Sequence, residues 1–310
     1  MHVLFIFMDG IGLGAANAEI NPFAQASMPV LEGMLGGKKM LAATAPYLGE
    51  HATLLALDAG MGVPGLPQSA TGQATLLTGL NIPLEIGQHY GPKPNPAVTK
   101  YLVARNLFSM LVHAGKSAAL LNAYPPRYFE GVDSGKRLYS AIPLAVTSAG
   151  LRLFTADDLK AGRALSADFT GEAWRQMLGF PDAPVFTPWE AGQKLTELTR
   201  QFDFSLFEYW ASDYAGHKQD MRWAVQQLEV FDQVLGGILA NTNGEQELIL
   251  ITSDHGNMED LSTRRHTYAQ VPGLLLGSAS ARAAFTEDLT DLAGISARIF
   301  NAIIPDQQDS

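Results

Sequence analysis

The sequence predicts an α/β fold, a three-layer sandwich in which helices cover both faces of a central, mostly parallel sheet. Short, continuous apolar runs of strand length recur along the chain, and longer stretches with helical patterns separate them. A run that is apolar throughout is typical of a strand buried on both faces, and strands that alternate with helices favour a parallel sheet. With 310 residues, of which 47% are hydrophobic, the chain is long enough for one large domain or two modest ones.

The first expected strand covers residues 3–8 and stops at Asp9-Gly10. Further strands are expected at residues 52–57, 117–121, 204–209, 247–252 and 273–276. Helices are expected at residues 70–80, 98–114, 187–200, 220–239 and 288–302. The helix at 187–200 has the clearest start signal, because Thr187, Pro188 and Glu190 match a capping box with a proline at the first helical position.

The segment 124–186 interrupts this alternation. It contains Pro125-Pro126, several glycines and only short helical patterns such as 155–160. We therefore expect a discontinuous α/β core formed by residues 1–123 and 187–310, with residues 124–186 inserted as a small cap at the edge of the sheet.

Composition excludes several classes of partner and chemistry. Lys and Arg total 21 against 31 Asp and Glu, a net charge of −10, and no basic block could follow a nucleic-acid backbone. The absence of cysteine excludes disulfides and thiolate metal sites and fits a reducing compartment. The apolar run at 3–8 is too short to span a membrane. These features predict a soluble, cytoplasmic protein without a nucleic-acid or membrane partner; they predict no oligomeric state.

Side chains that bind metals are concentrated where the expected strands end. Asp9 follows the first strand, and Ser69 opens a helix. Asp213 and His217 follow the strand at 204–209, Asp254 and His255 follow the strand at 247–252, and His266 comes shortly afterwards. Ligand sites of such sheets lie at the carboxyl ends of the strands. Imidazole and carboxylate ligands suit zinc, manganese or iron, and six of them exceed the needs of one tetrahedral site, so two metals are expected.

Each of these motifs has a simpler explanation when taken alone. Ser69 could cap a helix, Asp213 and His217 could be an ordinary pair at i and i+4, and Asp254-His255 could be a surface loop. If none of these residues binds a metal, each motif needs its own separate explanation. The occurrence of all of them at strand ends therefore favours a metal site.

The ordered motifs Asp9-Gly10, Ser69 in Gln-Ser-Ala-Thr-Gly-Gln, Asp213-x-x-Gly-His217, Asp254-His255-Gly-Asn and His266-Thr267 resemble those of the alkaline phosphatase superfamily. The branch they resemble most contains cofactor-independent phosphoglycerate mutase and phosphopentomutase. The resemblance implies two divalent metal ions, manganese or zinc. It assigns one ion to Asp213, His217 and His266 and the other to Asp9, Asp254 and His255. Ser69 is then the nucleophile, and a metal-dependent phosphatase or phosphomutase acts on a small phosphorylated metabolite through a phosphoserine.

Two departures from this branch leave the reaction open. Gln73 stands where the mutases have histidine, and the long substrate-binding insertion of phosphoglycerate mutase is absent or much reduced. A mutase must exclude water while it returns the phosphoryl group, so hydrolysis and a mutase reaction are equally compatible. A phosphodiesterase or nucleotide pyrophosphatase on the same core is the alternative. Candidate contacts to the substrate are the basic residues Arg264, Arg265, Lys93 and Arg127, with Arg137 as a similar choice.

Two further classes of protein fit parts of the sequence. A dinucleotide-binding oxidoreductase would explain the G-x-G-x-x-A pattern at residues 10–15, but Asp9 would repel the pyrophosphate, and Pro22 and Pro29 interrupt the helix that this motif needs. A non-catalytic protein that binds metal or phosphate esters would keep the same site residues. Only an activity measurement separates that protein from an enzyme.

Overall fold

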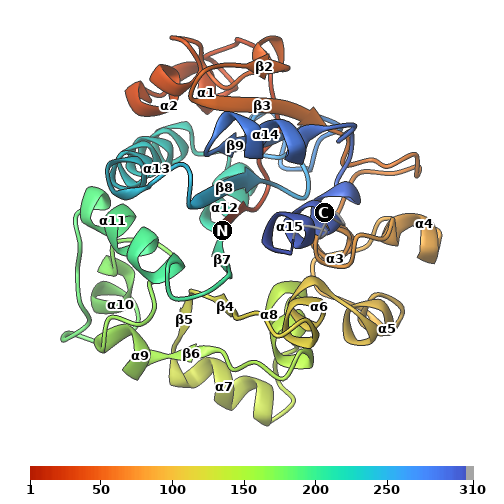
Figure 1. The fold of residues 1–310 in the computed structure, drawn as a ribbon, viewed down its shortest axis with the longest axis vertical. Coiled ribbons are helices and arrows are strands. Elements are labelled where there is room, and N and C mark those ends of the chain that lie inside the picture. Colours follow the sequence, from red (N-terminus) through yellow and green to blue (C-terminus); the bar gives the residue numbers. More distant parts are fainter. Residues whose placement is uncertain (305–310) are drawn as a thin grey trace, which may run out of the picture.

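The structure is a computed structural model and describes residues 1–304 (Figure 1). Its centre is a seven-stranded sheet in the order β2-β3-β9-β8-β1-β7-β4. The strands, in this order, are Tyr47–Leu48, Ala52–Leu57, Val271–Leu276, Glu247–Thr252, His2–Met8, Phe204–Tyr209 and Ala118–Leu120. The predicted α/β class is therefore confirmed.

The sheet is parallel at its centre and mixed at one side. β1 pairs in parallel with both β7 and β8, and β4 pairs in parallel with β7. β9 is antiparallel to β8 and to β3. It follows that β3 runs in the same direction as β1, while β9 begins at the edge of the sheet where β1, β3, β7 and β8 end.

Helices cover both faces of this sheet, as Figure 1 shows. On one face lie α11 (Pro188–Thr199) and α13 (Met221–Asn241). On the other face lie α3 (Ser69–Thr78), α5 (Pro96–Ala104), α6 (Leu107–His113), α8 (Ala141–Ser148) and α15 (Gly294–Ile303). Alternate side chains of β1 enter the two apolar cores, Leu4 and Ile6 on one side and Phe5 and Phe7 on the other. These are the three layers that the sequence predicts.

Shorter elements connect these layers. They are α1 (Pro22–Gln25), α2 (Pro29–Met34), η1 (Ala42–Thr44), α4 (Ile82–Ile86), α12 (Ala211–Lys218) and α14 (Ala279–Thr286). None of the helices within residues 1–304 combines the length and apolar character needed to cross a membrane.

The segment 124–186 contributes to both cores. It contains β5 (Ala123–Tyr124, which begins one residue earlier), α7 (Pro126–Asp133), α8, β6 (Phe154–Thr155), α9 (Ala156–Lys160) and α10 (Glu172–Gln176). Tyr128 and Ile142 join the core of one face, whereas Phe169 joins the other and stacks on Phe207 with ring centroids 4.7 Å apart. The division into a core and a cap stays a prediction.

Two expected helices have different bounds. The pattern at 98–114 forms α5 and α6, because the Asn106 side chain accepts a hydrogen bond from the Ser109 N–H (3.1 Å) and starts a second helix. The last helix begins at Gly294 rather than at residue 288. Residues 290–291 are instead extended beside Asp58, whose N–H donates to the Thr290 carbonyl (2.9 Å).

Candidate metal centre

Five of the predicted site residues lie at one edge of the sheet because they follow strands with the same direction. Asp9 comes directly after β1, and Asp213 and His217 belong to α12 after β7. Asp254 and His255 follow Ser253, the first residue after β8. Ser69 is the first residue of α3, which follows β3. This placement is the one expected for a ligand site of an open α/β sheet.

His266 reaches the same edge for a different reason. It precedes β9, and β9 is antiparallel to β8, so the beginning of β9 lies beside the end of β8. The Thr267 N–H donates to the Gly256 carbonyl (3.0 Å), which ties the His266 segment to the loop after β8. From the sequence, only the motif predicted that His266 belongs to the site. The antiparallel direction of β9 explains why His266 lies there.

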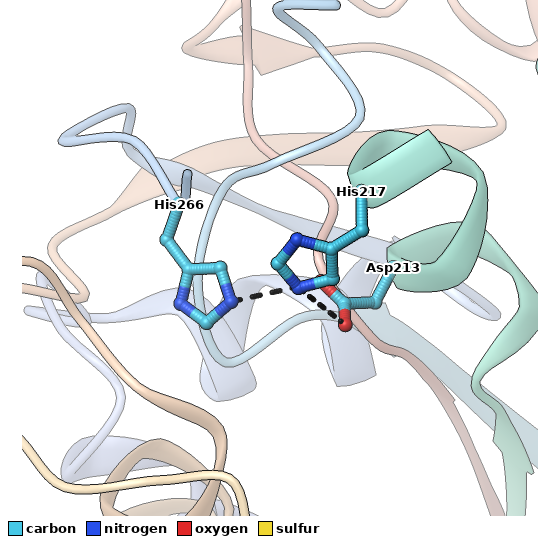
Figure 2. Close-up of side chains that lie close together, drawn as sticks. All are labelled: Asp213, His217 and His266. Carbon is cyan, nitrogen blue, oxygen red and sulfur yellow. Dashed lines mark ion pairs between the residues drawn. The ribbon is translucent and has the colours of Figure 1, made fainter. Parts of the chain in front are cut away.

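Asp213, His217 and His266 form what we call the outer cluster (Figure 2). His217 Nε2 lies 3.3 Å from Asp213 Oδ2, and His266 Nε2 lies 3.8 Å from Asp213 Oδ1. The opposite ring nitrogens are held by backbone carbonyls: His217 Nδ1–H donates to Arg264 O (2.7 Å) and His266 Nδ1–H donates to Pro67 O (2.8 Å). This arrangement leaves both Nε2 atoms free to bind a metal, as in proteins whose metal-binding histidines donate the other N–H to a carbonyl.

Asp9, Asp213 and His255 form the inner cluster, so Asp213 belongs to both clusters. His255 is fully buried, and its Nε2 lies 3.3 Å from Asp9 Oδ1 and 3.0 Å from the Ser69 hydroxyl oxygen. The rings of His255 and His266 stack with centroids 3.7 Å apart, which joins the two clusters. The structure thus brings Ser69 and the ligand candidates of both clusters together.

Asp254 lies beside His255 but is a member of neither cluster. Its Oδ2 lies 3.7 Å from His255 Nε2, but its oxygens are not within 4.8 Å of every atom of either cluster. The Gln73 amide donates to Asp254 Oδ2 (3.2 Å), so this carboxylate already has one partner in the described structure. Its role as a metal ligand stays a proposal.

The ionisable groups of the site shift one another's pKa values. Burial and the charges of Asp254 and Asp213 raise the pKa of Asp9 well above its ordinary value. Burial opposes a charge on His255, but Asp254, Asp9 and Asp213 outweigh it and raise the pKa of His255 to about 10. Burial and the His255 charge lower the pKa of His266 to about 4, which keeps this imidazole neutral and able to bind a metal.

The residues fit divalent metal ions. Asp9 Oδ1 is buried and makes no hydrogen bond of good geometry, and the nearest group that can neutralise it is His255 Nε2, 3.3 Å away. A divalent ion bound between the two atoms would neutralise this carboxylate in place of the His255 proton. Three carboxylates and three imidazoles are ligands of the kind that bind zinc and manganese. The donor set and the buried Asp9 oxygen therefore support metal binding independently of each other.

Two glycines permit the close approach of loops around the clusters. Gly10 adopts a φ of +69°, and a Cβ there would lie 2.7 Å from Asp213 Oδ1. A Cβ on Gly72 would lie 2.8 Å from the Asp254 carbonyl oxygen. Both distances are too short for any side chain, so glycine at these positions lets α3 and the first loop pack against the ligand-bearing segments.

Sequence reasoning missed the residues that orient the ligands. The Asn257 side chain donates to Asp213 Oδ1 (2.7 Å), and its N–H donates to Glu259 (2.8 Å). The buried carboxylate of Glu259 also accepts from the Gly12 N–H (3.0 Å), which joins the first loop to the loop after β8. Asn257 is the last residue of the Asp-His-Gly-Asn motif, and its closeness in sequence to Asp254 could have indicated a role in the site. No sequence feature pointed to Glu259.

A buried carboxyl group in β7 was also missed. Glu208 accepts a hydrogen bond from the Tyr124 hydroxyl (3.3 Å), and burial together with the nearby charge of Asp9 raises the pKa of Glu208 to about 7. It sits in a strand that is apolar at most other positions, and nothing in the local sequence indicates that its side chain faces the core.

In the described structure, no contact joins the four basic residues that the sequence predicts as substrate contacts. Arg264 and Arg265 are exposed, and Arg264 Nε donates to Gln219 (3.0 Å) while its carbonyl holds His217. Arg127 is exposed on α7. Lys93 is partly buried and donates to the Leu138 carbonyl (3.1 Å).

The glycine-rich run at 10–15 does not open a helix. Residues 9–20 form turns and irregular loop, and α1 begins only at Pro22. A dinucleotide-binding motif needs a helix N-terminus directly after its glycines to receive the pyrophosphate. The structure therefore removes the physical basis of the oxidoreductase alternative.

Residues 189–307 match the family model of the Metalloenzyme superfamily. Over 151 residues, 44% of this chain, the sequence is 29% identical to 2,3-bisphosphoglycerate-independent phosphoglycerate mutase of Halobacterium salinarum. A similar match of 29% identity over 140 residues exists to the enzyme of the same name from Thiobacillus denitrificans. The matched regions cover only 29% and 27% of those relatives, so the chain spans less than a third of their length.

Solved structures share the fold. Alkaline phosphatase from the Antarctic bacterium TAB5 superposes with a TM-score of 0.52 and 12% identity, covering 98% of this chain and 97% of that one. Phosphonate monoester hydrolase of Agrobacterium radiobacter gives a TM-score of 0.52 and 13% identity, covering 97% and 73%. The family match, the relatives and the shared fold confirm the resemblance to the alkaline phosphatase superfamily that the motifs predicted.

Proposed function

We propose that this chain, a relative of the Metalloenzyme superfamily over residues 189–307, is a metal-dependent phosphoryl-transfer enzyme that acts on a small phosphate ester. The observation that carries the proposal is the position of the Ser69 hydroxyl, 3.0 Å from His255 Nε2 and therefore beside the inner cluster. Ser69 is also the first residue of a ten-residue helix, where the positive end of the helix dipole favours an anion.

The proposed ligand sets follow the two clusters. Asp213, His217 and His266 would hold one divalent ion. Asp9, His255 and the shared Asp213 would hold the other, with Asp254 and Ser69 as further ligands of this second ion. Manganese or zinc fits these donors. When bound, a divalent cation lowers the pKa of a hydroxyl that it coordinates and stabilises negative charge on a phosphoryl group.

The chain's own residues would then act as follows. The Ser69 oxygen attacks phosphorus, the bond to the leaving alcohol breaks, and a phosphoserine forms. Asn257 holds the Asp213 carboxylate, and Gln73 holds that of Asp254, so neither ligand must reorient during the reaction. The Thr71 hydroxyl, the other candidate nucleophile, lies 3.1 Å from the Gln68 carbonyl and 3.3 Å from the Tyr90 carbonyl, which favours Ser69.

The proposal includes both outcomes for the phosphoserine. Transfer to water makes the enzyme a phosphatase, and return to the same substrate makes it a mutase. The named relatives are mutases of phosphoglycerate, but they are matched over a minor part of their length. The assay must therefore measure both the release of inorganic phosphate and the isomerisation of sugar or glycerate phosphates.

Replacement of the nucleophile tests the proposal. We expect Ser69→Ala to lose at least about 1,000-fold in turnover, because the proposal assigns the covalent intermediate to the Ser69 oxygen. Its metal content should stay close to that of the unmodified chain, since the other ligand candidates remain. Turnover is measured with a panel of phosphate esters, and metal content by elemental analysis. The matched control is Ser280→Ala, an exposed serine in α14; full activity in Ser69→Ala would contradict the proposal.

A further inference from the structure

A loop next to the nucleophile carries a lysine near the site. The carbonyl of Tyr90 accepts a hydrogen bond from the Thr71 N–H (3.0 Å), and a Cβ on Gly91 would lie 3.3 Å from the Ser69 backbone nitrogen. The loop therefore packs directly on the start of α3. Lys93 is two residues further on, so its Cα lies within about 8 Å of the Gly91 Cα by chain geometry.

The Lys93 side chain reaches the segment that carries Arg137 from a distant part of the sequence. Lys93 Nζ donates to the carbonyl of Leu138 (3.1 Å), the residue next to Arg137. The guanidinium carbon of Arg137 lies over the Tyr128 ring, 4.7 Å from its centroid. Burial and the charge of Arg137 both lower the pKa of Lys93, in agreement with two positive groups that lie near each other.

Neither of these two cations is neutralised by the protein in the part of the chain that the structure describes. No carboxylate within residues 1–304 lies within 4.0 Å of either charge, although Asp and Glu outnumber Lys and Arg by 31 to 21. In contrast, Arg152 and Arg163 both pair with the buried Asp158. Arg137 is exposed and Lys93 is partly buried, so both charges are open to an anion that arrives from solvent. An anion that contacts both would gain two favourable charge interactions.

We propose that Lys93 and Arg137 bind a second anionic group of the substrate, a carboxylate or a second phosphate, while the reacting phosphate occupies the Ser69 site. The inference rests on the proposed function, because it places the pair relative to that nucleophile. It assigns to the enzyme substrates with two anionic groups in preference to esters with one. Lys93 offers a point charge, and Arg137 offers a planar fork that can bind a carboxylate or phosphate through two hydrogen bonds.

Matched ligands test this assignment. Binding to the metal-loaded Ser69→Ala chain is measured by calorimetry with 3-phosphoglycerate and glycerol 3-phosphate, which differ by a carboxylate, and with fructose 1,6-bisphosphate and fructose 6-phosphate, which differ by a phosphate. We expect at least one doubly anionic ligand to bind about 10-fold or more tightly than its partner. The pair that discriminates identifies the second anion as carboxylate or phosphate. Equal affinities in both pairs would overturn the inference.

Variants show whether the two cations cause the preference. Lys93→Met and Arg137→Met, each added to Ser69→Ala, should each remove most of the preference and leave the singly anionic ligand bound as before. Arg137→Lys should keep a part of it, since the charge remains. The control is Lys100→Met, an exposed lysine on the neighbouring α5; a preference that survives Lys93→Met and Arg137→Met would overturn the assignment.

Phosphate release by the unmodified chain separates this inference from the proposed function. Turnover of any ester in the panel, combined with equal binding of both members of each pair, overturns only the role of Lys93 and Arg137. A chain that binds metal but neither releases phosphate nor isomerises any phosphate ester overturns the proposed function itself.

Discussion

At the scale of single residues, Asp213 has the central position in the site. One of its oxygens faces His217 and the other lies near His266, and the same carboxylate belongs to the inner cluster with Asp9 and His255. Burial would raise the pKa of Asp213, but hydrogen bonds from His217 and Asn257 and the charge of His255 lower it to about 2. This group is therefore ionised at every pH at which the enzyme would work.

Loss of this shared carboxylate should affect both metal positions. We expect Asp213→Asn to bind neither ion at stoichiometric metal, whereas His217→Ala, which changes only the outer cluster, should lose one ion and keep the other. Loss of a residue that only hydrogen-bonds to a metal ligand typically weakens metal binding by about 10–100-fold. Loss of the ligand itself should weaken it by more. Elemental analysis after gel filtration gives the metals per chain. Retention of two ions by Asp213→Asn would show that Asp213 is not a ligand.

The raised pKa of Glu208 predicts how the stability of the folded chain changes with pH. Its pKa in the folded chain is about 7 against an ordinary value of 4.5, so the folded state binds the proton more tightly than the unfolded state. Stability from this group is therefore complete below pH 4.5, decreases as the pH rises to 7 and is constant above it. The full difference is of the order of 3 kcal/mol, at 1.36 kcal/mol per pKa unit.

Glu208→Gln should remove this pH dependence. In urea unfolding of the metal-free chain, the variant should gain stability relative to the unmodified chain between pH 5 and pH 8, because glutamine pays no cost of ionisation. The control is Glu130→Gln, an exposed glutamate on α7. Parallel pH profiles for the unmodified chain and Glu208→Gln would show that Glu208 is not held in the protonated form.

At the scale of elements, the sequence predicted those whose signal is local. The strands β3, β7 and β8 have the predicted bounds because each is a continuous apolar run with a polar residue or turn after it. The capping box of α11 is present as predicted. The late start of α15 was missed because it depends on a tertiary contact, the pairing of residues 290–291 with Asp58. The break at Asn106 had a local signal, the Asn106–Ser109 cap, but the apolar pattern runs across it.

The packing of α11 on α13 depends on glycine. A Cβ on Gly192 would lie 2.0 Å from the Val234 carbonyl oxygen, and one on Gly237 would lie 2.0 Å from that of Trp189. We expect Gly192→Ala to destabilise the chain by about 2 kcal/mol or more, because the two helices must separate to admit the methyl group. Urea unfolding measures this change.

The matched control for this substitution is Gly33→Ala. Gly33 lies inside α2, and a Cβ there would meet no atom within 4 Å. Alanine should stabilise the chain at this position by about 0.5–1 kcal/mol, since it restricts the unfolded backbone. Equal effects at Gly192 and Gly33 would mean that α11 and α13 do not pack as closely as described.

At the scale of the whole molecule, the fold brings together motifs that are distant in sequence. The sequence predicted that Asp9, Ser69, Asp213, His217, Asp254, His255 and His266 meet at one edge of a sheet, and the structure places them there. It could not predict that Asp213 is shared, that Gln73 donates to Asp254, or that Lys93 donates to the Leu138 carbonyl. These contacts depend on the order and direction of strands, which a single sequence does not specify.

Metal content and phosphoryl transfer, measured on one preparation, test the account most directly. The chain is stripped with a chelator, given manganese or zinc in steps, and assayed at each step for bound metal, phosphate release and isomerisation of phosphate esters. We predict that activity returns as the metal content approaches two ions per chain, and that Ser69→Ala binds the same metal without activity. A chain that binds no metal, or an activity that the chelator does not affect, would contradict the account.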